Sequence, residues 1–430
     1  MSALIESLRS GFDALHAADA TELGVARRNA LAAAVAKDLP TQRDEAWKYT
    51  ALRALGARKF ATTANTAPFD VALLAEIPAP RLVFVNGAFN SSLSDLSGLP
   101  SGIELRPLSQ TLATGEPSSI DFLVRQFDQG DAFALLNSAF ANDGILLRVA
   151  ANTVSEIPIH LVFAGAAADA DLAAHLRHLV ELGENSRATI VEHHLSTGAH
   201  QHLFNHLVEV HAAPGAELLH ARVQDESDGA SLITRTDAEL SANSRYQRVD
   251  LELGAALSRH ELNVRLQGGG ARVQSSGTLL ATGRRHVDTR LCIEHQAGDT
   301  RCDLLWRGLA AGRGRAVFHG GITIHAGADG SSAALSNKNL LLSESAEIDT
   351  QPVLEIHADE VTASHGATVG QLDPRHLFYL RARGIPEAQA RGMLTAAFCR
   401  ETLASIGNPA LAATLTAMLD AKLTSLEIGE

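Results

Sequence analysis

From about residue 145 to residue 370, short apolar runs recur without any stretch of helix-length periodicity. The clearest alternation is that of Val287, Thr289, Leu291 and Ile293, with polar or charged residues between them. Regular short strands bounded by turns are typical of a β-sandwich, a barrel or a β-solenoid. A stacked solenoid accommodates so long a run best, because each coil buries its inner face on its neighbours. Candidate strands begin near residues 272, 286, 300, 315, 332, 347 and 361. The last is expected to run from Glu360 to Ala363, with His365 after it and a turn at Gly366.

The pattern divides the chain into three zones and predicts a mainly β protein with helical regions at both ends. Residues 1–145 open with an Ala- and Leu-rich helical pattern, and Arg81–Gly87 has the character of a short strand that ends in a turn. A further helix is expected from Phe122 to Phe140, because its apolar residues follow one broken face. Residues 146–370 form the β zone. A sandwich or barrel stays the alternative for it, since periodicity alone does not decide between them.

Residues 371–430 change to a helical pattern. Asp373 precedes Pro374, which places a capping residue before a proline at the first helical position. Gly384 ends this helix, Pro386 begins a second one, and residues 407–409 (Gly-Asn-Pro) separate the second helix from a third. Helices this short are not stable alone, so they must pack on the β zone, on each other or on a partner.

Charge and composition exclude several classes of protein. The net charge of -13 argues against binding of nucleic acid through phosphate neutralisation. No apolar run approaches the roughly 18 residues that a membrane span needs. The N-terminal segment resembles an amphipathic helix rather than a secretion signal, and only three cysteines occur in 430 residues. These features predict a protein of the cytoplasm.

The sequence shows few signs of catalytic chemistry. It contains no phosphate-binding GxxxxGK[ST] loop, no GxSxG turn and no HExxH helix, so we expect neither ATP hydrolysis nor another enzyme activity. Cys292, Cys302 and Cys399 lack the spacing of a zinc site, and each is interpreted as a small buried apolar residue. A protein that held a four-thiolate iron–sulfur cluster alone would need more cysteines.

Histidine and acidic side chains leave other interpretations open. His193 and His194 are adjacent, so in a strand they point to opposite faces, and we interpret them as surface or hydrogen-bonded residues rather than metal ligands. His175 and His178 are spaced to share a helix face. Several acidic residues of the β zone suit a charged outer face, or the acid–base pair of a carbohydrate-active β-helix enzyme: Asp288, Glu294, Glu347, Asp349 and Glu355.

Three motifs together resemble the SufB/SufD family. Residues 364–370 (Ser-His-Gly-Ala-Thr-Val-Gly), followed by Asp373 and residues 378–385 (Phe-Tyr-Leu-Arg-Ala-Arg-Gly-Ile), are similar to its C-terminal signature. Trp-Lys-Tyr-Thr at 47–50, after Arg-Asp-Glu at 43–45, and Val-Asn-Gly at 85–87 are similar to its N-terminal motifs. Members of the SufB branch are usually longer and carry a late cysteine. No cysteine lies between Cys302 and Cys399 here, which favours the SufD branch.

The resemblance implies a fold and a function. The expected fold is a helical N-terminal region, a central right-handed β-helix and a C-terminal helical subdomain. The expected function is that of a non-ATPase scaffold for iron–sulfur cluster assembly. Such a scaffold pairs with a SufB-like subunit through its β-helix, docks a SufC-like ATPase through its C-terminal helices, and forms a homodimer in isolation. It contributes to iron acquisition and to the nascent cluster, and reduced flavin is linked to the complex. No cofactor bound stably by the chain alone is implied.

Particular residues follow from the motif matches. His365 matches the histidine thought to hold iron or the nascent cluster at the interface with SufB, where a neutral imidazole can complete a ligand shell begun by a partner's thiolate. Some members carry a cysteine where this chain has Ala363, so His365 is the only ligand that the motif offers here. The segment that should dock the ATPase supplies aromatic anchors and arginines. Its matching residues are Asp373, Phe378, Tyr379, Arg381, Arg383 and Gly384.

Two further functions stay as alternatives: a carbohydrate-active β-helix enzyme, and a homodimeric interaction protein without chemistry. A further alternative concerns the docking segment, whose aromatic residues Phe378 and Tyr379 would be core residues if the segment bound no partner.

Overall fold

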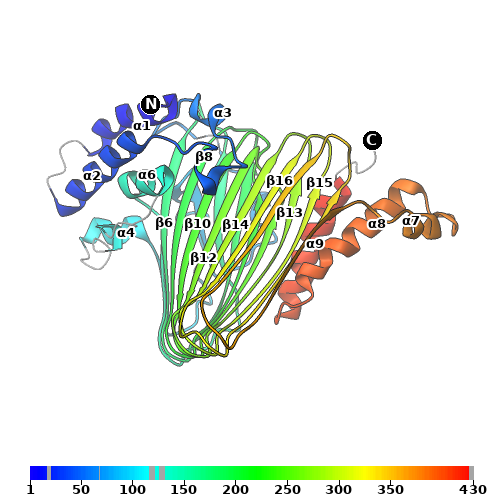
Figure 1. Cartoon of the computed structure of the whole chain (residues 1–430). Coiled ribbons are helices and arrows are strands. Elements are labelled where there is room, and N and C mark those ends of the chain that lie inside the picture. The colour runs from blue at the N-terminus through cyan, green and yellow to red at the C-terminus, as the bar shows by residue number, and fades with distance from the viewer. Residues whose placement is uncertain (17–20, 67, 116–121, 125–130, 426–430) are drawn as a thin grey trace.

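A computed structural model of the chain describes residues 1–16, 21–66, 68–115, 122–124 and 131–425. Two long β-sheets form a solenoid, N-terminal helices lie over one side of it, and C-terminal helices lie on the other (Figure 1). The expectation of a mainly β solenoid with helices at both ends is confirmed.

The chain passes alternately from one sheet to the other. Each strand of the solenoid therefore pairs in parallel with the strand two places along the chain, as β11 pairs with β13 and β12 pairs with β14. The first sheet contains β1 (Arg81–Val85), β2 (Ala88–Phe89), β5 (Ile159–Ala166), β7 (Arg187–Thr197), β9 (Glu217–Asp225), β11 (Arg245–Glu252), β13 (Arg272–Ala281), β15 (Arg301–Ala310), β17 (Ser332–Leu341) and β19 (Thr362–Gly370). The second contains β3 (Ile103–Pro107), β4 (Ile145–Val149), β6 (Ala173–Leu182), β8 (Leu203–Ala212), β10 (Ser231–Leu240), β12 (Leu257–Leu266), β14 (His286–His295), β16 (Arg315–Ile324) and β18 (Glu347–Ile356).

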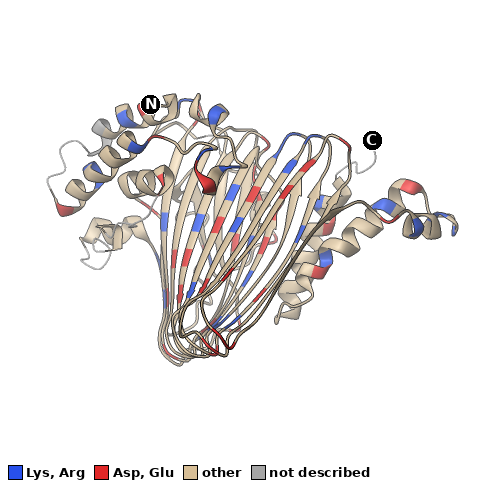
Figure 2. Ribbon diagram, in the orientation of Figure 1, with Lys and Arg blue, Asp and Glu red and all other residues tan. Residues whose placement is uncertain are grey.

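The strand positions predicted for the second half of the solenoid agree with the structure. β13, β14, β16, β17 and β18 begin at the predicted residues, and β15 and β19 begin one residue later. Apolar alternation identified them because their inner faces form the aliphatic core, which includes Leu291, Ile293, Leu304 and Ile322. Charged residues recur at matching positions on neighbouring strands of the second sheet (Figure 2).

Stacked asparagines and glycines turn the chain between the sheets. Asn185 and Asn243 have φ angles of 55° and 57°, in the left-handed region that asparagine tolerates. On the next coil Gly270 has a φ of 73°, and a Cβ there would lie 2.4 Å from Oδ1 of Asn243. This position therefore needs glycine for both its backbone angle and its close packing.

The N-terminal helices cover strands of the second sheet. They are α1 (Ala3–His16), α2 (Glu22–Lys37), α3 (Arg53–Gly56), α4 (Leu108–Thr114) and α6 (Ala132–Phe140). The helix predicted from Phe122 to Phe140 falls partly outside the described residues, and α6 is its second half. Trp47 is buried, and the guanidinium of Arg259 in β12 lies 3.9 Å from its ring centroid and donates to the carbonyl of Ala46 at 2.8 Å. The N-terminal motif thus anchors the helices to the solenoid.

The C-terminal helices lie against the outer face of the first sheet. They are α7 (Pro374–Arg381), α8 (Glu387–Arg400), a short 3-10 helix (Glu401–Leu403) and α9 (Pro409–Ser425). Apolar residues of α8 and α9 pack on Val223, Val249 and Leu251, and the buried guanidinium of Arg307 in β15 contacts the carboxylate of Glu401 at 2.9 Å. α7 contributes no buried residue and extends away from the sheet (Figure 1).

Two local predictions are wrong. His175 and His178 lie on strand β6, not on a helix, because their segment pairs along its whole length with β8. The strand expected at 360–363, with a turn at Gly366, is instead β19, which continues through His365 and Gly366 to Gly370. Pairing with β17 supplies these residues with the ladder hydrogen bonds that a turn would have lost.

Candidate functional site

The last coil of the solenoid is open. β18 and β19 are the terminal strands of the two sheets, and each pairs with a neighbour on one side only. Their side chains are mostly exposed or half-buried, and Ile356 and Val369 are 44% and 43% exposed. Strands with a free edge and exposed apolar residues are suited to pairing with another chain.

His365 lies on the row of this last coil that faces the interior. By register it follows Leu335 in β17 and Leu304 in β15, and both leucines belong to the hydrophobic core. Its neighbour Ala363, two residues away on the same face, also packs against that core. No strand pairs with β19 on its other side among the described residues, so the imidazole of His365 is exposed. A partner stacked on this end would meet the imidazole directly.

The cysteines of this chain do not add a thiolate to that site. Cys302 and Cys399 are buried and Cys292 is half-buried, and all three are free thiols. Burial raises the pKa of Cys302 to about 12 and also raises the pKa values of Cys292 and Cys399 above their ordinary range. Neutral thiols are poor nucleophiles and poor metal ligands, which agrees with their interpretation as apolar residues.

The aromatic residues of the docking segment are not core residues. Phe378 is 73% exposed and Tyr379 is 57% exposed. The guanidinium of Arg383 lies 3.5 Å from the ring centroid of Tyr379, and Arg381 pairs with Glu387 at 3.1 Å. These contacts hold an aromatic and basic patch at α7, a helix that packs on α8 but contains no buried residue. Large exposed aromatic side chains of this kind are typical anchors of protein interfaces.

The two remaining residues of that segment shape the helix. The carboxylate of Asp373 accepts a hydrogen bond of 2.8 Å from the backbone amide of Arg375, as predicted for an N-cap. Gly384 has a φ of 84° and ends the turn after α7, also as predicted. Both residues therefore have a structural role in presenting Phe378 and Tyr379.

Four of the five acidic residues singled out in the β zone have basic partners. Asp288 contacts Arg259, Glu294 contacts His325 at 3.3 Å, and Asp349 and Glu347 contact Arg315 at 2.7 Å and 3.3 Å. Glu355 lies on the same outer row of β18 and is exposed. Paired charges spread over several strands suit the interpretation as a charged outer face.

His193 and His194 point to opposite faces of β7, as expected. His193 faces outward and contacts His160 at 3.0 Å, whereas His194 faces inward and contacts Glu192 at 3.1 Å. Both are buried rather than on the surface, and both have partners. Desolvation lowers the pKa of His193 to about 3, and it also lowers the pKa of His194 despite the nearby carboxylate. The two rings are therefore neutral at physiological pH.

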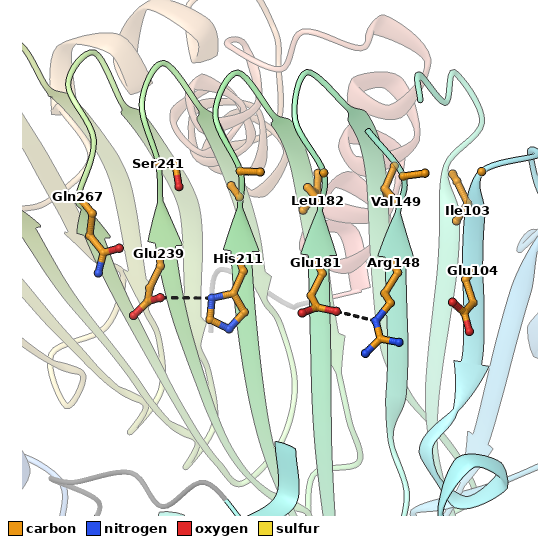
Figure 3. A pocket seen from close by; sticks show the side chains of 15 residues that line it. Ile103, Glu104, Arg148, Val149, Glu181, Leu182, His211, Glu239, Ser241 and Gln267 are labelled. Carbon is orange, nitrogen blue, oxygen red and sulfur yellow. Dashed lines mark hydrogen bonds and ion pairs between the residues drawn. The ribbon is translucent and has the colours of Figure 1, made fainter. Parts of the chain in front are cut away.

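One surface groove was not predicted from the sequence. It has a volume of about 810 Å³ and runs across the strand ends of the second sheet. Figure 3 shows its charged side chains in register on neighbouring strands, with Arg148 paired to Glu181 and His211 paired to Glu239. The carboxylate of Glu209, 3.8 Å from Nε2 of His211, raises the pKa of that imidazole above its ordinary value. Most of the charged side chains that line the groove are thus already paired with one another.

Comparison with known proteins identifies the family. Residues 163–398 match the family described as "SUF system FeS cluster assembly, SufBD core domain", and residues 2–161 match the "SufBD protein N-terminal region". The chain belongs to the SufBD family. No helix among the residues that the structure describes is long and apolar enough to cross a membrane.

Similar proteins align with this chain over most of their length. A SufBD family protein of Synechocystis is 34% identical over 383 residues, which are 86% of this chain and 84% of the relative. The iron–sulfur cluster assembly protein SufD of Escherichia coli is 30% identical over 389 residues, which are 90% of this chain and 89% of SufD. A chloroplast protein of Arabidopsis thaliana, ABCI7, is 27% identical over 86% of this chain and 79% of its own length. The resemblance of the motifs to this family is thereby confirmed.

Proposed function

We propose that this SufBD family protein is a scaffold subunit without ATPase activity in a complex with a SufB-like subunit and a SufC-like ATPase. The observation that carries the proposal is the position of His365 on the inward row of an open terminal coil. A SufB-like solenoid that pairs with the edges of β18 and β19 would place its own residues opposite this imidazole.

Iron and the nascent cluster are the cargo of the proposed site. Neutral imidazole binds iron, but one imidazole is too few ligands for an ion or a cluster. Because Ala363 supplies no thiolate and the three cysteines lie elsewhere, the partner must contribute the remaining ligands. This division of ligands explains why the chain alone should not hold a cluster stably.

The ATPase is proposed to dock on α7 through Phe378 and Tyr379, which are the exposed anchors, with Arg381 and Arg383 at their side. In isolation, the free edges of the last coil are proposed to pair with a second copy of the chain and form a homodimer. In the complex, a SufB-like subunit takes the place of that second copy. Both proposals use surfaces that the fold leaves exposed and that a stable complex would cover.

Compartment and cofactor complete the proposal. The cytoplasm suits a protein whose three cysteines are free thiols. No catalytic activity of its own is proposed. The link between the complex and reduced flavin stays a prediction, since no motif of this chain assigns residues to a flavin.

The test is the variant His365→Ala in the reconstituted three-protein complex. We expect the complex to assemble with its ATPase activity intact, while its iron content and its yield of assembled cluster fall severalfold. His357→Ala is the matched control, because His357 is also exposed and follows β18 in the same coil. An unchanged cluster yield in His365→Ala would show that the ligand role is wrong. Turnover of a polysaccharide by the chain alone would favour the carbohydrate-active alternative.

A further inference from the structure

Part of the interior of the middle coils is filled by charged rather than apolar residues. In β11 the inward row is Tyr246, Arg248, Asp250 and Glu252, and all four side chains are at most 2% exposed. Along the solenoid axis these inward positions are followed by apolar residues on both sides. The position of Glu252 leads to Phe163 towards the N-terminal end, and the position of Asp250 leads to Trp306 towards the C-terminal end. The charged residues therefore lie in a closed section between two apolar layers, where charges interact strongly and water is scarce.

We call the charged residues of this section the interior cluster: Glu192, Arg222, Arg248, Asp250, Glu252 and His260. Arg222 donates to Asp250 at 3.0 Å and also to Glu252, and Arg248 donates to Asp250 at 2.8 Å. Glu252 accepts a second hydrogen bond from Ser258 at 2.8 Å. Glu192 lies 4.0 Å from Arg248 and accepts a hydrogen bond of 2.6 Å from His220. The cluster therefore contains three carboxyl groups and two permanent cations.

His260 has no hydrogen-bonding partner for either ring nitrogen among the residues that the structure describes, although it is fully buried. A neutral imidazole carries one donor and one acceptor, and leaving both unpaired in the interior costs free energy. Its Nδ1 lies 3.8 Å from Oδ1 of Asp250, too far for a hydrogen bond. One ligand atom from each of Asp250, Glu252 and His260 lies within 4.8 Å of the others.

We propose that Asp250, Glu252 and His260 form a binding site for a divalent transition-metal ion inside the solenoid. β11 and β12 belong to opposite sheets, so two carboxylates from one sheet meet an imidazole from the other. Two oxygen ligands and one nitrogen ligand suit Fe²⁺, Mn²⁺, Co²⁺ or Zn²⁺ better than Ca²⁺ or Mg²⁺. The ion supplies the positive charge that the cluster lacks and a partner for the unpaired imidazole.

The two arginines make this a weak site. Arg222 and Arg248 already bind the same carboxylates, so the ion must share them, and its affinity falls below that of a structural zinc site. The site is separate from His365. Arg248 and His365 occupy the same row four strands apart, or about 19 Å at the usual strand spacing. The proposal therefore does not depend on the proposed function of the last coil.

The test uses Co²⁺ as the probe and the full-length chain after chelator treatment. Equilibrium dialysis allows for slow entry into a closed interior, and metal analysis then gives the number of ions bound per chain. His260→Leu replaces the imidazole with an apolar side chain, Asp250→Asn keeps the shape of the carboxylate without its charge, and His365→Ala is the control for binding at the last coil. We expect His260→Leu and Asp250→Asn each to bind one Co²⁺ fewer than the wild type, and His365→Ala to keep the interior ion.

A crystal of the wild type grown with Co²⁺ gives a result even where the interior variants fail to fold. An anomalous peak between Asp250 and His260 is the expected result, and its absence would overturn the proposal. Equal Co²⁺ content in the wild type and a folded His260→Leu would overturn it too. In that case His260 would be an unpaired side chain that the core tolerates, and its replacement by leucine would raise the melting temperature of the metal-free chain.

Discussion

Replacing Phe378 and Tyr379 together by alanine should weaken binding of the SufC-like ATPase and leave the fold intact. Exposed fractions of 73% and 57% mean that neither ring contributes much to the core. Surface substitutions of this kind change the free energy of unfolding by about 0.5 kcal/mol or less. Loss of the contact between Arg383 and Tyr379 adds roughly 0.5–1 kcal/mol, the value of an exposed cation–π pair.

The effect on binding should be larger. An aromatic anchor at the centre of an interface contributes about 2 kcal/mol or more, and two neighbouring anchors are not additive. A loss of at least about 2 kcal/mol corresponds to a rise in Kd of roughly 30-fold. The double variant should therefore appear folded by circular dichroism while its affinity for the ATPase falls well over tenfold.

Isothermal titration calorimetry with the ATPase measures this difference. Val71→Ala is the control, since Val71 is 64% exposed and lies in the N-terminal region. Point variants are preferable to deletion of residues 371–430, because the deletion would uncover the apolar residues of the first sheet on which α8 and α9 pack. An unchanged Kd in the folded double variant would refute docking through α7.

Four other predictions concern the solenoid. Trp47→Ala should lower the free energy of unfolding by about 3–5 kcal/mol because it removes a buried ring and its contact with the guanidinium of Arg259. Denaturant unfolding will measure this. Arg307→Met should lower the free energy of unfolding by about 1.5–3 kcal/mol, which is less than for a fully buried ion pair because the carboxylate of Glu401 is half-exposed. Glu401→Gln is the milder comparison in the same assay. Desolvation lowers the pKa of His175 in the folded chain from 6.5 to about 3, so the unfolded chain takes up the proton first as the pH falls. The free energy of unfolding should be constant above about pH 6.5 and fall by up to about 1.4 kcal/mol per pH unit below it. A constant free energy of unfolding from about pH 7.5 to about pH 5 would contradict this. Cys302, with its pKa raised to about 12, should not react with alkylating reagents at neutral pH until the chain is denatured, as site mapping by mass spectrometry will show.

Only the second half of the solenoid could be predicted strand by strand. There the inner rows are aliphatic and the outer rows are polar, so the alternation is visible in the sequence. Before residue 270 the inner rows carry Arg222, Arg248 and Asp250, so both faces of these strands contain polar residues and the alternation disappears. For this region the pattern predicted a β zone but not the positions of its strands.

The candidate site shows a similar limit. His365 could be selected by its motif, but its position on an inward row depends on a register with β17 that no local pattern reveals. The sequence could not decide whether Phe378 and Tyr379 are exposed, because an aromatic pair in a short helix fits a core as well as a docking surface. The interior cluster was missed because its members come from β7, β9, β11 and β12, and only the coiling of the chain brings them together.

The proposed docking helix and the proposed iron ligand are connected through a short physical route. α7 packs on α8, and the 3-10 helix that follows α8 contacts Arg307 of β15 through Glu401. β15 pairs with β17, and β17 pairs with β19, where the row of Arg307 continues as Lys338 and then Thr368. Thr368 lies three residues from His365 on the same strand.

We infer that an ATPase that moves α7 and α8 on closing acts first on β15, about 10 Å from the last coil. A parallel ladder in register resists bending within a coil, so the motion would reach the open end as a shift of β19 against the partner subunit rather than as a local change at His365.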